Sequence, residues 1–310
     1  MSTGRRSLIS LDEVADEDLR WMVDRGLGYA TRATAPTATL AGRVVGVGFR
    51  KTSTRTRTAF SVGALRLGAS LVTYGPNDLQ EATGETVEDT GRVLSRMLDL
   101  FVVRTSGDPE EMRRYTDGGR LSVVNAMSSE EHPTQALTDL TTLAQHFGDV
   151  AGLSVLYVGE GNNTAVALAK ALPRYSGTRL TVCTPPGYEL PAEVLAQAVE
   201  TGRRQGSEVV ARTGLDELPD RVDVVYTTRW QTTGTVKPDP NWRDVFAPFR
   251  VDEQLMARCD KAVFMHDLPA HRGEDVTAGV LEGDRSIAFD QAENKMWSAM
   301  AVLEWCLEVG

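Results

Sequence analysis

The sequence predicts an α/β protein built from two doubly wound domains, each with a parallel sheet. Helical and strand-like hydrophobic patterns alternate almost throughout the chain, as they do where parallel strands are joined by helices. The chain has 310 residues, which is more than one hydrophobic core usually serves. Two domains of this kind are therefore expected.

The first half of the chain contains four segments with strand character. A helix over Leu11–Tyr29 precedes them, with Leu19, Met22 and Val23 on one side. The strands are predicted at Arg43–Phe49, Leu71–Tyr74, Leu100–Arg104 and Leu121–Asn125. The helices after them are predicted at Thr58–Gly68, Thr86–Leu98, Pro109–Tyr115 and Pro133–His146.

A second series of strands and helices follows. The strands are predicted at Leu153–Val158, Leu180–Cys183, Glu208–Ala211, Val222–Tyr226 and Ala262–Met265. The helices are predicted at Thr164–Leu172, Ala192–Gln205 and Asp252–Arg258. A last amphipathic helix over about Gln291–Leu307 is expected to pack back on the first domain. We therefore assign residues 1–145, with 291–310, to the first domain and residues 146–290 to the second.

Composition excludes several classes of function. The net charge is −10, which argues against nucleic acid or an anionic membrane as the main partner. No stretch approaches the length of a membrane span, and the first twenty residues lack the continuous apolar core of a secretory signal. A cytoplasmic protein is therefore expected. The three cysteines, Cys183, Cys259 and Cys306, are far apart, which predicts buried reduced thiols and neither a disulfide framework nor a metal site.

The most informative motif is Ser53-Thr54-Arg55-Thr56-Arg57, after the strand that ends at Phe49. Hydroxyls, free backbone N–H groups and two guanidinium groups at a helix start form an anion cradle. The alternative is a simple helix cap with solvated arginines. A glycine-rich phosphate loop is missing from the sequence, so nucleotide hydrolysis of the usual kind is not expected.

Two further residues stand at the ends of predicted elements. Arg104 ends an apolar strand, where a cation points into the crevice at the carboxyl edge of a sheet or, alternatively, into solvent. His132 precedes Pro133, which suits the first turn of a helix. The positive end of the helix dipole disfavours protonation of His132, and a neutral imidazole can donate one hydrogen bond to a carbonyl oxygen. A purely structural histidine is the alternative.

Together these strings resemble the aspartate and ornithine carbamoyltransferase family. The similarity runs in order along nearly the whole chain, through residues 49–57, 79–80, 89–97, 103–105, 132–137, 159–163, 223–227, 266–273 and 292–295. It leans to the ornithine branch through Lys51-Thr52, Gly161-Asn162-Asn163 and Ala270-His271-Arg272-Gly273. The superficial dinucleotide pattern after Gly159 lacks its third glycine, which is Thr164, so nicotinamide binding is not expected.

The resemblance implies a homotrimer in which the first domain binds carbamoyl phosphate and the second binds an amine. Arg55, Arg104, His132 and Gln135 would be catalytic, without metal or organic cofactor. Arg104, His132 and Thr56 would contact the carbamoyl oxygen, and Gln135 the carbamoyl NH2. The full set implied for carbamoyl phosphate is Ser53, Thr54, Arg55, Thr56, Arg104, His132, Gln135, Leu268, Lys295 and, from the neighbouring subunit, Gln80.

Four departures from the ornithine branch fall where its second substrate and carbamoyl phosphate bind. Thr228 replaces an aspartate that grips the α-amino group, Thr232-Thr233-Gly234 replaces Ser-Met-Gly, Asp267 replaces a cysteine, and Lys295 replaces an arginine. Thr228 cannot neutralise an ammonium. Asp267 could bind a cationic group or take a proton from the attacking amine, so we add it to the predicted catalytic residues. The acceptor residues are expected to be Asn162, Asn163, Thr228, Thr232, Thr233 and Asp267.

We therefore expect a carbamoyltransferase acting on an ornithine-like or unusual amine, with phosphate as the second product. Aspartate also looks a poor acceptor, because Arg229 and Gln231 do not have the spacing that the aspartate branch uses for carboxylates. A true ornithine carbamoyltransferase that forms citrulline is one alternative. A non-catalytic paralogue that binds a metabolite is another, although retention of Arg55, Arg104, His132 and Gln135 argues against it.

Overall fold

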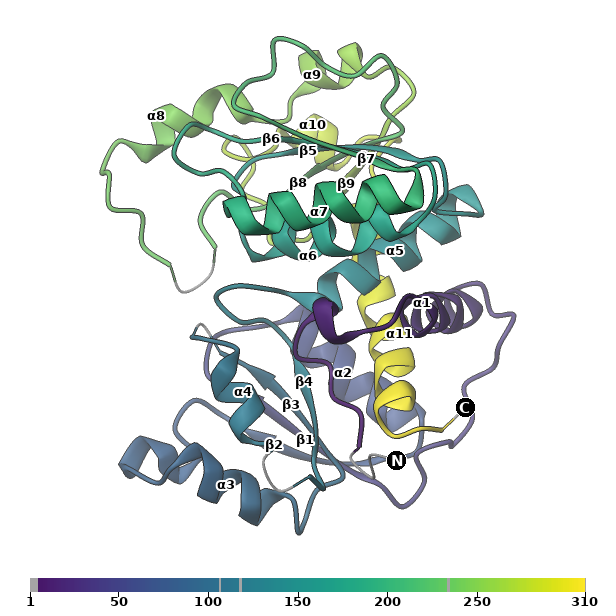
Figure 1. Cartoon of the computed structure of the whole chain (residues 1–310), viewed down its shortest axis with the longest axis vertical. Coiled ribbons are helices and arrows are strands. Elements are labelled where there is room, and N and C mark those ends of the chain that lie inside the picture. The colour runs from purple at the N-terminus through teal and green to yellow at the C-terminus, as the bar shows by residue number, and fades with distance from the viewer. Residues whose placement is uncertain (1–4, 106, 117–118, 233–234, 310) are drawn as a thin grey trace. The chain divides into compact units, whose positions relative to one another are not determined.

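A computed structural model describes residues 5–105, 107–116, 119–232 and 235–309. The chain divides into two compact units, Met1–Gln145 with Glu293–Gly310 and His146–Ala292. Each unit is built on a parallel sheet with helices on both faces (Figure 1). The predicted fold class, two doubly wound α/β domains, is therefore confirmed.

The sheet of the first unit has four strands in the order β2-β1-β3-β4. They are β1 (Val44–Phe49), β2 (Ser70–Tyr74), β3 (Leu100–Arg104) and β4 (Ser122–Asn125). One face carries α3 (Val87–Leu94) and α4 (Glu110–Arg114), and the other carries α1 (Asp16–Ala30), α2 (Arg55–Arg66) and α11 (Ala288–Cys306) (Figure 1). The strand order reverses between β1 and β3, and ligands of doubly wound sheets bind at such a switch point.

The sheet of the second unit has five strands in the order β7-β6-β5-β8-β9. They are β5 (Ser154–Val158), β6 (Arg179–Cys183), β7 (Glu208–Arg212), β8 (Val224–Thr227) and β9 (Val263–His266). The helix α5 (Pro133–Phe147) belongs to the first unit as far as Gln145 and leads the chain into the second. The helices of the second unit are α6 (Asn163–Ala171), α7 (Ala192–Gln205), α8 (Trp242–Phe246), α9 (Glu253–Arg258) and α10 (Ala278–Leu281). Here the strand order reverses between β5 and β8.

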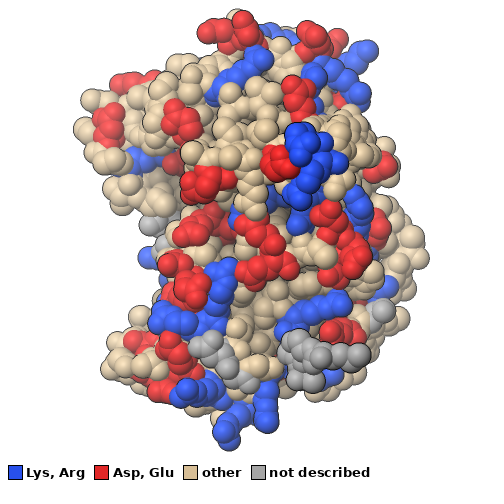
Figure 2. Space-filling view, viewed as in Figure 1, with Lys and Arg blue, Asp and Glu red and all other residues tan. Residues whose placement is uncertain are grey.

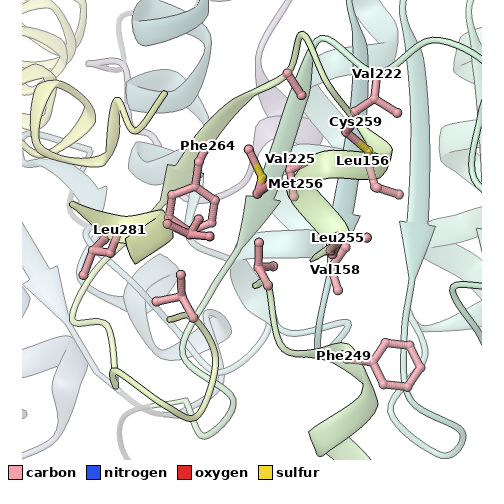
Figure 3. Close-up of a cluster of buried hydrophobic side chains, with 14 of the residues drawn as sticks. Leu156, Val158, Val222, Val225, Phe249, Leu255, Met256, Cys259, Phe264 and Leu281 are labelled. Carbon is pink, nitrogen blue, oxygen red and sulfur yellow. The ribbon is translucent and has the colours of Figure 1, made fainter. Parts of the chain in front are cut away.

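Apolar side chains hold the second sheet against its helices. Leu156, Val225 and Phe264 come from three neighbouring strands and pack with Leu255 and Met256 of α9 (Figure 3). Burial of each such side chain stabilises the fold by about 1.5–3 kcal/mol. Because these strands also carry the chain to the switch point, the cluster fixes the backbone from which the candidate residues project.

Some predicted boundaries are wrong. The first helix begins at Asp16 and not at Leu11, because Ser10 caps a separate 3-10 turn, η1 (Leu11–Glu13), and Val14 is extended. The helix after β1 begins at Arg55 and not at Thr58, which brings Arg55 and Thr56 into its first turn. The third helix ends at Leu94 and not at Leu98. Short elements were not predicted, namely η2 (Gln80–Thr83), η3 (Leu172–Arg174), η4 (Ala247–Phe249), α8 and α10.

Charged side chains of both signs are interspersed over the face in Figure 2, without one large single-sign field. In the described part of the chain, no helix is both long and apolar enough to cross a membrane.

Candidate functional site

The ends of β1 and β3 are joined at the switch point of the first unit. Phe49 pairs with Arg104 in the parallel ladder, and the Arg50 N–H donates to the Arg104 carbonyl oxygen at 3.1 Å. The Arg104 side chain is buried and donates from Nη1 to Ser53 Oγ at 3.1 Å. Two predicted residues separated by 51 positions therefore meet at one point.

The start of α2 lies directly after Ser53. Thr54 is the N-cap residue, but its side chain caps no backbone N–H. The first N–H groups of a helix have no intrahelical partner, and they stand at the positive end of its dipole. Thr56 is 6% exposed, whereas Thr54 is on the surface. The turn that carries Thr54, Arg55 and Thr56 thus offers N–H groups, hydroxyls and a guanidinium group to an anion.

His132 lies immediately before α5 and is 4% exposed. Burial lowers its pKa well below the ordinary value of 6.5, and the positive charges of Lys295 and Arg104 lower the pKa further. Its Nδ1 lies 3.3 Å from Thr134 Oγ1. The lowered pKa favours a neutral imidazole, as the sequence analysis expects, and burial is its largest cause. Lys295 and Arg104 therefore lie close enough to His132 for their charges to lower its pKa.

Gln135 is fully buried in the first turn of α5. Its Nε2 donates to Asp139 Oδ1 at 2.7 Å, and its Oε1 accepts a hydrogen bond from Lys295 Nζ. Lys295 lies on α11, far away in sequence. The structure therefore brings Gln135 and Lys295 into direct contact, and it adds Asp139, which the sequence analysis did not single out.

Gln80 begins η2 and is exposed. Its Oε1 accepts a hydrogen bond from the Thr83 hydroxyl at 2.8 Å. No described contact joins Gln80 to Ser53, Arg104 or His132 of its own chain. Its predicted role in the site of a neighbouring subunit stays a prediction.

The second switch point gathers neutral polar groups after β5 and β8. Asn162 caps α6, because its Oδ1 accepts from Thr164 N–H at 3.1 Å and Ala165 N–H at 3.2 Å. Its Nδ2 donates to Thr228 Oγ1 at 3.0 Å, and the Tyr157 hydroxyl lies 3.0 Å from the same oxygen. Thr228 is 2% exposed. Its hydroxyl is therefore held between the Asn162 amide and the Tyr157 phenol. Both the Oδ1 and the Nδ2 of Asn162 already make hydrogen bonds within the protein.

The next residues along this edge follow β9, which pairs with β8. Asp267 Oδ2 accepts from the Thr164 hydroxyl at 3.1 Å. The Leu268 N–H donates to His266 Nδ1 at 2.8 Å, and His266 Nε2 lies 2.6 Å from Asp275 Oδ2. This chain of bonds fixes the imidazole and, through it, the backbone of Leu268, which has a left-handed φ of 52°. Contact between Leu268 and carbamoyl phosphate stays a prediction.

Three predicted acceptor residues remain, namely Asn163, Thr232 and Thr233. Asn163 is buried in the first turn of α6. Within the described ranges, no group is hydrogen-bonded to the buried Thr232 Oγ1. Thr233 lies outside the described residues.

The sequence analysis missed an ion pair beside this edge. Lys237 Nζ lies 2.6 Å from Glu160 Oε1 and sits over the rings of Tyr188 at 4.3 Å and Phe246 at 4.5 Å. Burial lowers the pKa of Lys237, and Glu160 partly offsets this effect. A lysine in an irregular segment carries no sequence signal for such burial.

The sequence analysis also missed Asp139. This residue could have been found, because it stands four residues after Gln135 on a helix.

Three comparisons with known proteins bear on these residues, and the first is with models of protein families. Residues 6–145 match the family model described as the carbamoyl-P binding domain of aspartate/ornithine carbamoyltransferase, and residues 151–306 match its Asp/Orn binding domain.

The described residues form no group of three or more His, Cys, Asp and Glu side chains that could hold a metal ion.

Similar whole chains are named ornithine carbamoyltransferase. That of Acidothermus cellulolyticus is 41% identical over 299 residues, which is 95% of this chain and 92% of the relative. That of Halalkalibacterium halodurans is 36% identical over 303 residues, or 96% and 94%. The solved ornithine carbamoyltransferase of Pyrococcus furiosus superposes with a TM-score of 0.89 at 33% identity and covers 98% of this chain and 97% of its own.

Proposed function

Since this chain belongs to the aspartate/ornithine carbamoyltransferase family and is a carbamoyltransferase, we propose that it transfers the carbamoyl group of carbamoyl phosphate to an ornithine-like or unusual amine. Phosphate is released. The observation that carries the donor half of this proposal is the hydrogen bond from Arg104 to Ser53 beside a neutral, buried His132. We propose that the anion cradle and these two hydrogen-bond donors bind one molecule of carbamoyl phosphate there.

In the first unit, Ser53, Thr54, Arg55 and Thr56 would bind the phosphate of carbamoyl phosphate. Arg104 and His132 would donate to the carbamoyl oxygen, where negative charge grows in the tetrahedral transition state. If the Thr134 hydroxyl donates to Nδ1, the proton of the neutral imidazole is on Nε2, which can then donate. Gln135 Oε1 would accept from the carbamoyl NH2.

The reaction we propose is a transfer to the amine by addition and elimination, without a covalent enzyme intermediate. The lone pair of a neutral amine attacks the carbamoyl carbon, and the carbonyl oxygen becomes an oxyanion. When the oxyanion collapses, the bond from carbon to the phosphate oxygen breaks and phosphate leaves with its electron pair. The amine must lose a proton in this sequence, and Asp267 is the carboxylate that we assign to accept it.

The acceptor side favours a substrate other than ornithine. Thr228 offers a neutral hydroxyl bonded to Asn162 and Tyr157, so an α-ammonium placed there would have no carboxylate from this position. An uncompensated buried charge costs several kcal/mol. Asp267, bonded to Thr164, supplies a carboxylate elsewhere along this edge. We infer that the acceptor presents a neutral hydrogen-bonding group to Thr228.

A true ornithine carbamoyltransferase is the second candidate, because the similar proteins carry that name. A non-catalytic metabolite-binding paralogue is the third. We further propose a cytoplasmic homotrimer in which the exposed Gln80 of one subunit completes the carbamoyl-phosphate site of its neighbour. A solution mass of one chain alone would contradict the trimer.

Phosphate release from carbamoyl phosphate tests the proposal across a panel of amines that includes L-ornithine. We expect the highest kcat/KM with an amine other than ornithine, and carbon-13-labelled carbamoyl phosphate should place its label in a ureido group of that amine. Dominant citrulline formation would support the second candidate, and no release with any amine would support the third. In Arg55→Ala and His132→Ala, kcat should fall by about 10²–10³ while the proteins remain folded.

A further inference from the structure

We infer that Asp139 and Lys295 hold the Gln135 amide in one orientation, so that its oxygen and not its nitrogen meets the carbamoyl NH2. This inference rests on the proposed role of Gln135 in carbamoyl-phosphate binding. Asp139 would be a positioning residue, which acts through Gln135. Lys295 would have the same role in addition to its predicted role in binding.

The contacts of Gln135 define both ends of its amide. Its Nε2 donates to Asp139 Oδ1 at 2.7 Å, one turn further along α5. Its Oε1 accepts from Lys295 Nζ, which comes from α11, 160 positions away in sequence. Gln135 and Asp139 are fully buried, and Lys295 is 7% exposed. All three residues belong to the first unit.

The chemistry of the two neighbours makes the orientation unambiguous. An ammonium group only donates hydrogen bonds, and an ionised carboxylate only accepts them. Rotating the amide by half a turn would place NH2 against the ammonium and oxygen against the carboxylate. Both charge-assisted hydrogen bonds would be lost, and the buried polar groups would be left without partners, which is costly. Without charged neighbours, the last torsion of a glutamine has two similar orientations.

This orientation matters for one part of the substrate. The carbamoyl NH2 is a donor, and the second lone pair of Gln135 Oε1 can accept from it while Lys295 uses the first. A flipped amide would place two donors face to face. Inorganic phosphate has no carbamoyl group, so its affinity should not depend on the orientation. The ratio of the affinities for carbamoyl phosphate and inorganic phosphate therefore reports on the orientation of the Gln135 amide.

The experiment measures Kd for carbamoyl phosphate and for inorganic phosphate by titration of the full-length protein. We expect Asp139→Asn to weaken the binding of carbamoyl phosphate about tenfold, because an asparagine amide can donate as well as accept and no longer fixes the Gln135 amide. The Kd for phosphate should stay unchanged. Lys295→Met acts on the other end of the amide and provides a second variant if Asp139→Asn does not fold. It should lower the affinity ratio in the wild-type background more than in the Gln135→Ala background, which separates the positioning of Gln135 from the predicted direct contact of Lys295 with carbamoyl phosphate. Adding Asp139→Asn to Gln135→Ala should not lower the ratio further.

Three results would overturn the inference. Asp139→Asn and Lys295→Met could leave the ratio at its wild-type value. Asp139→Asn could weaken both ligands equally, as a general structural defect would. It could also lower the ratio in the Gln135→Ala background, where no amide remains to be oriented. A wild-type protein that binds both ligands equally would instead overturn the proposed role of Gln135, and this inference with it.

Discussion

Neutrality of the buried His132 should make the protein sensitive to mild acid. Its pKa is lowered well below 6.5 by burial and by the charges of Lys295 and Arg104, whereas the unfolded chain restores an ordinary pKa. Between these two pKa values the unfolded state binds one proton more than the folded state, so stability falls as the pH falls. The contribution of neutral His132 to the stability is fully present above about pH 6.5 and decreases as the pH falls below this value.

The size of this effect follows from linkage. If the folded pKa stays below the range tested, acidification from pH 7.5 to 5.5 should cost about 1.4 kcal/mol from this histidine alone. The perturbation that isolates it is His132→Asn, which removes the titration. Urea unfolding of both proteins at both pH values should therefore give a loss that is smaller by about 1.4 kcal/mol in the variant.

The control is His146→Asn, which removes an exposed imidazole. The chain has only four histidines, so nitrogen-15 labelling of this residue type gives a direct view of each ring. Equal losses in wild type and His132→Asn, or a protonated His132 ring in the folded protein at pH 5.5, would refute the reasoning.

Three further substitutions test other parts of the structure. Glu304 is fully buried and accepts from Arg25, Tyr29 and Thr39, so Glu304→Gln should cost near the lower end of about 3–5 kcal/mol; an unchanged melting temperature would contradict this. Gly161→Ala would place a Cβ 2.4 Å from the Leu190 backbone nitrogen, so it should raise KM for the acceptor but not Kd for carbamoyl phosphate; a change in both would mean wider disruption. Lys237→Met should lower the melting temperature because it leaves Glu160 unpaired, and Glu160→Gln in the same chain should restore part of the loss; no rescue would mean that the ion pair contributes little.

The fold was largely predictable because its signals are local. Buried strands such as β3 and β5 are short apolar runs bounded by polar residues, and α7 was predicted at Ala192–Gln205, where it is found. The early end of α3 and the break before α1 depend on single capping contacts, such as the bond from Asp12 N–H to Ser10 Oγ. Periodicity does not report such contacts.

The candidate site was predictable only in part, because a sequence shows local patterns and many contacts of the site join distant residues. Ser53 and Arg104 follow strands of one parallel sheet, so their meeting could be argued from topology. The contact between Lys295 and Gln135 spans 160 positions, and that between Lys237 and Glu160 spans 77. No local pattern encodes such contacts. For Thr228, the sequence predicted the missing charge, but not that Asn162 and Tyr157 would hold its hydroxyl.

The central claim is that the start of α2, Arg104 and His132 bind one molecule of carbamoyl phosphate. A crystal structure with this ligand bound tests it most directly. We predict the phosphate at the N–H groups and side chains of Ser53–Thr56, with Arg104 and His132 within hydrogen-bonding distance of the carbamoyl oxygen. Carbamoyl phosphate bound elsewhere, or Arg104 and His132 turned away from its carbonyl oxygen, would contradict the account.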